Sequence, residues 1–149
     1  MRKMICGSLL LLLVSCSKPL SPWKVNKIET SNPSYNSSRY IFTDGNTRFE
    51  LYKTAYETVG YFSVTSLPIP SLLENSSISQ IRLTIDDDRE TVIAHRITGG
   101  QKLILPENTL QKILEALKEK KSVTLETGRY SLTLTSPPEE LSLYNCTNR

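Results

Sequence analysis

The chain has 149 residues with 18 basic and 15 acidic side chains, three cysteines and one histidine. This length suits a single domain with a core of ordinary size. A formal charge of only +3 argues against an electrostatic nucleic-acid binder, which would carry a concentrated excess of basic residues. A single histidine also excludes a metal site built from several histidines.

The N-terminus has the pattern of an export signal. Arg2 and Lys3 give a positive start, and an apolar stretch broken only at residues 6–8 runs from Ile5 to Val14. This stretch is shorter than the ~20 residues of a membrane-spanning helix and has the length of a signal-peptide core. It leads into Leu13-Val14-Ser15-Cys16, in which a small residue precedes a cysteine.

This run resembles the lipobox of bacterial lipoproteins. The resemblance implies that residues 1–15 are a signal peptide that is removed, and that Cys16 becomes the first mature residue, carrying acyl chains such as palmitate. Two or three chains would anchor the protein to a membrane, since each buried CH₂ contributes about 0.8 kcal/mol. Ser17 stands where an aspartate would favour the inner membrane, so the outer membrane is expected. The alternative is an ordinary secretory signal in which Cys16 has no role.

The mature chain would be nearly neutral, with 16 basic and 15 acidic residues, because Arg2 and Lys3 leave with the signal. Cys6 would leave too and Cys16 would carry lipid, so Cys146 would be the only free thiol. In an oxidising compartment a single leftover cysteine near an exposed terminus suggests an intermolecular disulfide. The alternative is a tail thiol without a role.

Residues 16–38 are expected to form the lipidated cysteine and a flexible tether. They contain three prolines and many serines and asparagines, with few apolar residues to bury. Such a composition cannot offset the entropy lost on ordering. Trp23 is the exception in this segment, and docking on the domain, contact with a membrane interface and no role are all open for it.

A β-rich domain is predicted for residues 39–137, followed by a loose tail at 138–149. Asp44-Gly45 between two β-rich runs predicts a hairpin, and alternating apolar and polar residues predict further strands. The expected strands are 40–43, 48–52, 56–65, 81–86, 93–97, 102–105, 123–125 and 130–134.

One helix is predicted at about 106–120. Its leucines and isoleucine, Leu110, Ile113, Leu114 and Leu117, repeat at helical spacing and form an apolar stripe. Such a stripe must pack on a sheet. The fold class is therefore mainly β, an antiparallel β-sandwich or barrel-like domain of about seven or eight strands with one amphipathic helix.

The order of elements from Ile81 to Thr135 is strand, acidic turn, strand, glycine pair, helix, strand, glycine turn, strand. This order is similar to that of the invasion-associated locus B family, small periplasmic β-sandwich proteins of bacteria. The resemblance implies a role in the cell envelope. The disulfide-forming cysteines and Gly-Phe segment of that family are missing here, so no functional residue carries over.

Two features of the sequence are candidate chemical sites. His95 is the only histidine, so any serine-histidine-aspartate machinery must use it, but its strand pattern favours a partly buried, hydrogen-bonded structural residue. The acidic turn could supply oxygen ligands to a calcium-like cation, or it could be a solvated turn that contains Arg89. Its acidic residues are Asp86, Asp87, Asp88 and Glu90.

The sequence thus predicts no enzyme, no cofactor and no nucleic-acid partner. We expect a lipid-anchored envelope protein whose small β-domain binds another envelope component, a protein above all. The alternatives are a structural envelope protein cross-linked through Cys146, and a secreted hydrolase that uses His95.

Overall fold

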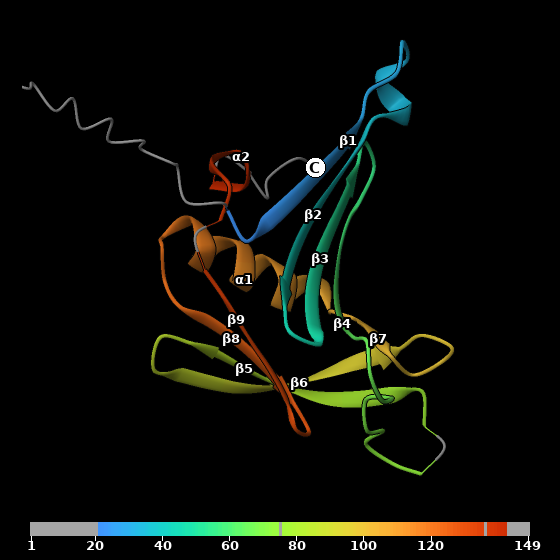
Figure 1. Ribbon diagram of the computed structural model, residues 1–149, viewed down its shortest axis with the longest axis vertical. Coiled ribbons are helices and arrows are strands. Elements are labelled where there is room, and N and C mark those ends of the chain that lie inside the picture. The colour runs from blue at the N-terminus through green and yellow to red at the C-terminus, as the bar shows by residue number, and fades with distance from the viewer. Residues whose placement is uncertain (1–20, 75, 136, 143–149) are drawn as a thin grey trace, which may run out of the picture.

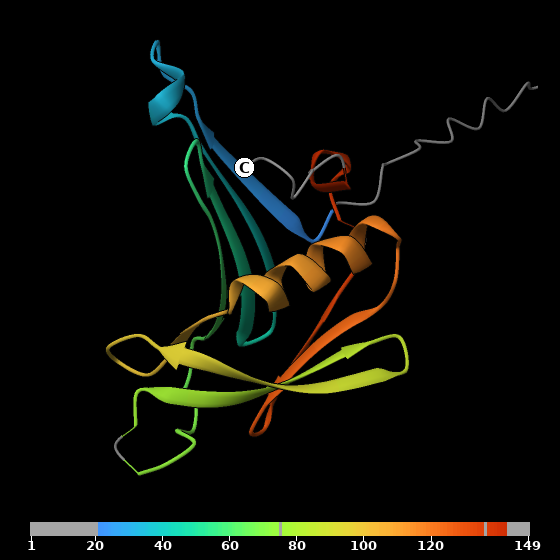
Figure 2. The same ribbon diagram turned by 180° about the vertical axis from the view of Figure 1, so that it is seen from behind.

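The computed structural model describes residues 21–74, 76–135 and 137–142 (Figure 1). Nine antiparallel strands form one sheet in the order β1-β2-β3-β4-β7-β6-β5-β8-β9. The sheet curls into a half-barrel, and helix α1 lies along its concave side (Figures 1 and 2). The predicted class, mainly β with one amphipathic helix, is confirmed, and the barrel-like alternative describes it better than two stacked sheets.

The strands are β1 (Trp23–Ile28), β2 (Ser37–Asp44), β3 (Thr47–Thr54), β4 (Thr58–Val64), β5 (Ile78–Ile85), β6 (Asp88–Arg96), β7 (Lys102–Ile104), β8 (Val123–Thr127) and β9 (Tyr130–Leu134). The helical segments are the 3-10 turn η1 (Pro33–Tyr35), α1 (Glu107–Lys118) and the short α2 (Glu139–Ser142). Among the described residues, none of these helices has the length and apolar character needed to cross a membrane.

The core lies between the concave face of the sheet and α1. Successive side chains of a strand point to opposite faces, and one set from each strand turns inward. Phe49, Phe62 and Leu125 are fully buried in this way. The predicted helical stripe meets them, because Ile113 and Leu117 are buried on the facing side of α1.

The ends of α1 follow from local chemistry. Pro106 precedes the first helical residue, where its missing N–H leaves no donor unsatisfied. At the other end the Lys121 amide donates to the Ala116 carbonyl and the Lys120 amide to the Leu117 carbonyl. This is the Schellman pattern. Lys120 takes the left-handed conformation, φ 59°, that glycine usually supplies there.

The tether predicted for residues 16–38 is wrong for the part that the structure describes. Strand β1 pairs with β2 along its whole length, from Trp23 opposite Phe42 to Ile28 opposite Ser37. The loop between them is held by the Asn36 side chain, which accepts a hydrogen bond from the Thr30 amide at 2.7 Å. Composition concealed this strand because its alternation rests on only two inward apolar residues, Trp23 and Val25. The domain therefore begins before residue 39.

The predicted loose tail is also corrected at its start. Residues Glu139–Ser142 form α2, and Leu141 is buried against the core. Residues 143–149, which include Cys146, lie outside the described residues, as does Cys16.

Trp23 joins the two ends of the curled sheet. Its side chain is buried, with the ring edge-on to Phe42 at 5.2 Å and to Phe49 at 6.0 Å between centroids. Its indole Nε1 donates a hydrogen bond of 2.7 Å to the carbonyl of Thr135, directly after β9. The first and last strands are not neighbours in the ladder, so this side chain links the two edges of the half-barrel.

Replacement of Trp23 tests whether β1 belongs to the folded domain. We expect Trp23→Ala to lower the free energy of unfolding by about 3–5 kcal/mol, because a large core side chain is lost, with Trp23→Phe intermediate. Urea denaturation measures this. The control, Tyr56→Ala, removes a side chain that is 81% exposed and should change stability by less than about 0.5 kcal/mol. Equal stability of Trp23→Ala and the control would restore the tether interpretation.

Candidate binding face

The convex face of the sheet lies opposite α1 (Figures 1 and 2). The strand residues that point to this face are at least partly exposed, with the exception of Glu50. His95 is at the centre of an apolar group on this face. In the strand register it lies between Ile78 of β5 and Ile104 of β7, and Ile93 and Ile97 flank it two residues away on the same face. We call these five residues the outer patch.

The outer patch is open to solvent. Ile93 is 45% exposed, Ile97 36% and Ile104 38%, and His95 is exposed as well. The expectation of a partly buried histidine is wrong, because α1 covers the opposite face, where Ala94 is buried. Clustered exposed apolar side chains in a folded domain mark a contact surface more often than singly scattered ones do.

Basic residues dominate the convex face around the outer patch. The register places six basic and two acidic strand residues on it, although the whole sequence has 18 basic and 15 acidic residues. The basic residues are Lys24, Arg39, Arg48, Arg82, Arg89 and Lys102, and the acidic ones are Glu50 and Glu126. This asymmetry gives the face a positive potential.

An ionic cluster around one buried carboxylate borders the outer patch. The side chain of Glu50 is only 7% exposed although it lies on the convex face. Lys102 Nζ is 2.6 Å from one of its carboxylate oxygens, and Arg39 Nε is 3.9 Å from the other. Lys102 also lies 4.1 Å from the centre of the Tyr61 ring, and Tyr61 pairs with Ile104. The cluster thus fixes the side chains beside the patch.

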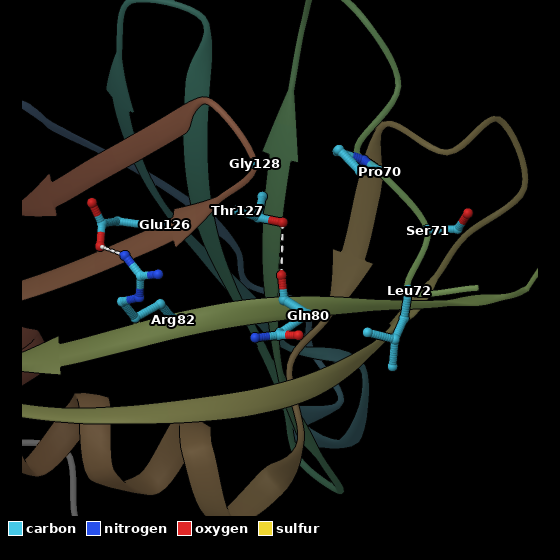
Figure 3. Close-up of a pocket in the computed structure, with 8 residues that line it drawn as sticks. All are labelled: Pro70, Ser71, Leu72, Gln80, Arg82, Glu126, Thr127 and Gly128. Atoms are coloured by element: carbon cyan, nitrogen blue, oxygen red, sulfur yellow. Dashed lines mark hydrogen bonds and ion pairs between the residues drawn. The ribbon is translucent and has the colours of Figure 1, made fainter. Parts of the chain in front are cut away.

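A cleft opens next to the outer patch where β5 and β8 separate (Figure 3). The two strands pair only between Arg82–Glu126 and Ile85–Val123. Beyond that point the Thr127 hydroxyl donates to the Gln80 carbonyl at 2.8 Å, in place of a ladder bond. The cleft has a volume of about 280 Å³. It is lined by Pro70, Ser71, Leu72, Gln80, Arg82, Glu126, Thr127 and Gly128.

The far wall of the cleft is a loop that is tied down at both ends. The buried Ser79 hydroxyl donates to the Pro70 carbonyl at 2.6 Å, and the Tyr130 hydroxyl donates to the Leu67 carbonyl at 3.2 Å. Hydrogen bonds with Ser66 and Arg129 lower the pKa of Tyr130 below its usual value. Gly128 has φ +56°, and a side chain there would come within 3.0 Å of Pro70. The wall is therefore set by specific contacts.

Arg82 is the side chain of the cleft best suited to a ligand. It lies 3.5 Å from Glu126, and the two side chains are 59% and 38% exposed. An exposed pair of this kind contributes at most about 1 kcal/mol, so a carboxylate from a partner can replace Glu126. Because Gln80 pairs with Ile93, a bound segment could contact the cleft and the outer patch together.

The acidic turn, a candidate cation site in the sequence, uses part of its charge in contacts within the fold. The Asp86 carboxylate accepts a hydrogen bond of 3.0 Å from the Ser122 amide, and Glu90 forms an ion pair with Lys112 of α1. Within the described ranges, no three histidine, cysteine or acidic side chains, Asp87 and Asp88 included, are placed to hold a metal ion together.

Comparisons with known proteins add no relationship. No family model matches this chain, and neither a curated protein nor a solved structure is significantly similar to it.

Removal of Lys102 tests the ionic cluster. We expect Lys102→Ala to lower the free energy of unfolding by about 1.5–3 kcal/mol, because buried Glu50 loses a charged hydrogen-bond donor. The matched control is Lys112→Ala, whose ion pair with Glu90 is exposed and should contribute at most about 1 kcal/mol. Glu50→Gln in the Lys102→Ala background should recover part of the loss. Chemical denaturation measures these free energies of unfolding. Equal losses in the two lysine variants would contradict a special contribution of Lys102 to the ionic cluster.

Proposed function

We propose that this protein is a bacterial envelope lipoprotein, anchored through acyl chains on Cys16, whose β-domain binds another envelope protein through the outer patch. The observation that carries the binding role is the group of exposed isoleucines around His95, bordered by basic residues and the cleft. The export pattern and the Leu13-Val14-Ser15-Cys16 run are the observations that support the proposed anchor. The outer membrane is the proposed location. We propose no catalytic role for the domain.

The chemistry of the face indicates the kind of partner. Isoleucines offer apolar area without directional bonds, which suits the apolar centre of a protein interface. The surrounding basic residues favour a partner with an acidic rim, because opposite potentials speed encounter and set orientation. Arg82 in the cleft would pair with a carboxylate of that rim.

The placement of the face fits an anchored protein. Along the long axis of the molecule, the start of β1 lies about level with α1, and strands β5 and β6 lie nearer one end (Figures 1 and 2). An anchor preceding β1 would therefore be attached away from β5 and β6, which leaves the outer patch open to a partner.

The mass of the mature N-terminus tests the anchor. We expect intact-protein mass spectrometry to find a chain that begins at Cys16 and carries two or three acyl chains. Cys16→Ser should release the protein from the membrane fraction. A chain that begins near Ser17, or an unmodified Cys16, would support plain secretion instead.

Charge placed in the outer patch tests the binding role. We expect a component captured from solubilised envelopes by the wild-type protein to be lost, by at least about tenfold, with Ile93→Asp/Ile104→Asp, because central interface residues each contribute more than 1 kcal/mol. The control is Tyr56→Asp, which places the same charge at a distant residue that is 81% exposed. If both variants captured the component equally, at unchanged urea midpoints, the outer patch would not be the binding surface.

A further inference from the structure

Strand β6 is fully paired on only one of its two edges. On the β5 side its register is unbroken from Asp88 to His95. On the other side, within the described ranges, the strand beside it is β7, which pairs with His95 and Arg96 alone. Residues 89–93 therefore have a side without a neighbouring strand, although β6 lies in the middle of the sheet. We call this side the free edge.

The backbone groups of the free edge belong to the odd-numbered residues. In an antiparallel ladder the N–H and C=O groups of successive residues point to opposite edges. The Arg96 amide donates to the Ser77 carbonyl, on the β5 side, and the Ile97 amide donates to the Lys102 carbonyl, on the β7 side. Counting back in twos from the second of these, the residues whose N–H and C=O groups point to the free edge are Arg89, Thr91 and Ile93.

The free edge exists because β7 ends early. Continued register would place Pro106 opposite Ile93, and proline has no N–H to donate. The Pro106 carbonyl instead accepts a hydrogen bond of 2.9 Å from the Leu110 amide in the first turn of α1. Leu105 stays with β4, because its amide donates to the Gly60 carbonyl. The chain then continues into α1, and no other strand of the described ranges takes the place beside β6.

The free edge is open to solvent. Arg89, Thr91 and Ile93 are all exposed, and Ile93 also belongs to the outer patch. A cleft of about 530 Å³ lies between the turn end of the β5–β6 hairpin and α1, with Lys112 and Ala116 on the helix side. An extended segment beside β6 would thus have the outer patch on one of its faces and this cleft on the other.

We propose that the envelope partner adds an extended segment to the free edge of β6, as a further strand in line with β7. This rests on the proposed function and gives the binding mode of the same surface. An unpaired strand edge is a template for another chain, and strand addition draws affinity from main-chain hydrogen bonds and specificity from alternate side chains. One set of partner side chains would lie beside Ile93 and extend the outer patch. The other set would lie on the side of Val92 and the cleft.

The side chains along the free edge indicate what the segment is like. The charges of the turn end at Glu90, whereas Thr91, Val92 and Ile93 carry none, so uncharged side chains fit opposite them. A second copy of this chain suits the edge less well. Pairing of two β6 edges would set two mostly basic convex faces side by side, and like charges oppose association. A partner with an acidic rim meets no such repulsion.

Hydrogen exchange tests the strand addition. The mature chain, residues 16–149 with Cys16→Ser, is mixed with solubilised envelopes, and its complex is separated from the free chain by gel filtration. Mass spectrometry with electron-transfer fragmentation then measures exchange at single amides. We expect the complex to slow exchange of the Thr91 and Ile93 amides by at least about tenfold, because they gain acceptors. The amides of Val92 and Ala94 point to β5 and should change much less.

Proline at position 91 gives a second test. Thr91→Pro removes one N–H of the free edge without removing a donor to β5, and proline is tolerated on strand edges. We expect capture of the envelope component to fall by at least about tenfold. The matched control is Thr133→Pro, because Thr133 is exposed and its N–H points to the outer edge of β9. The two variants should have similar urea midpoints and differ in capture.

The outcomes separate this inference from the proposed function. If the wild-type chain formed no complex with any envelope component, the proposed function would fail and the strand addition with it. A complex in which Thr91 and Ile93 exchange as in the free chain, or equal capture by the two proline variants, would overturn the strand addition and leave the outer patch as the contact. A dimer of the chain alone that Thr91→Pro separates would make a second copy the occupant and overturn the assignment to a partner.

Discussion

The indole of Trp23 is the contact on which the closure of this fold depends. A curled sheet of nine strands leaves two edges that cannot both be satisfied by ladder hydrogen bonds unless the barrel closes. Here the Trp23 side chain spans the gap, with its ring among Phe42 and Phe49 and its N–H on the carbonyl of Thr135. The Thr47 hydroxyl of β3 adds a second link, a hydrogen bond of 3.3 Å to the Ser131 carbonyl of β9. The edge strand that carries it is thereby fixed, and so is the end of β9.

The same arrangement divides the sheet into two chemically different faces. The concave face uses its apolar residues to bury α1, and Glu90 pairs with Lys112 of that helix. The convex face keeps isoleucines exposed around His95 within a mostly basic field. Among the described residues of this face, Glu50 is the deeply buried charge, and Lys102 and Arg39 compensate it. Core formation and surface recognition thus occupy opposite sides of the same strands.

Local patterns predicted the elements whose signal lies within a few residues. The stripe from Leu110 to Leu117 predicted α1, and Asp44-Gly45 predicted the turn between β2 and β3, where Gly45 has φ +54°. Strand β1 was missed because its two inward residues stand among prolines and serines that dominate the average composition. Its order comes from pairing with β2 across a loop, which composition does not report.

The candidate site was less accessible from sequence. Alternation placed His95 on the same face as Ile93 and Ile97, but Val92 and Ala94 made the other face apolar too. Which face α1 covers is decided by residues far along the chain, so the exposure of His95 could not be read locally. Apolar residues on both faces of β6 were the available signal for a contact surface. The cleft at Arg82 depends on β5 lying beside β8, a non-local pairing.

The hydrogen bond from Trp23 to Thr135 joins residues 112 positions apart, which bears on the order of folding. Contacts of such long sequence separation require closure of a large loop and tend to form late. Strands β2 to β4 can pair as successive hairpins while the chain is still incomplete, but the indole has no acceptor until β9 is in place. During synthesis, which starts at the N-terminus, β1 would therefore stay at an open edge of the sheet until almost the whole domain has been made. The last step of folding would then bring the beginning and the end of the domain together.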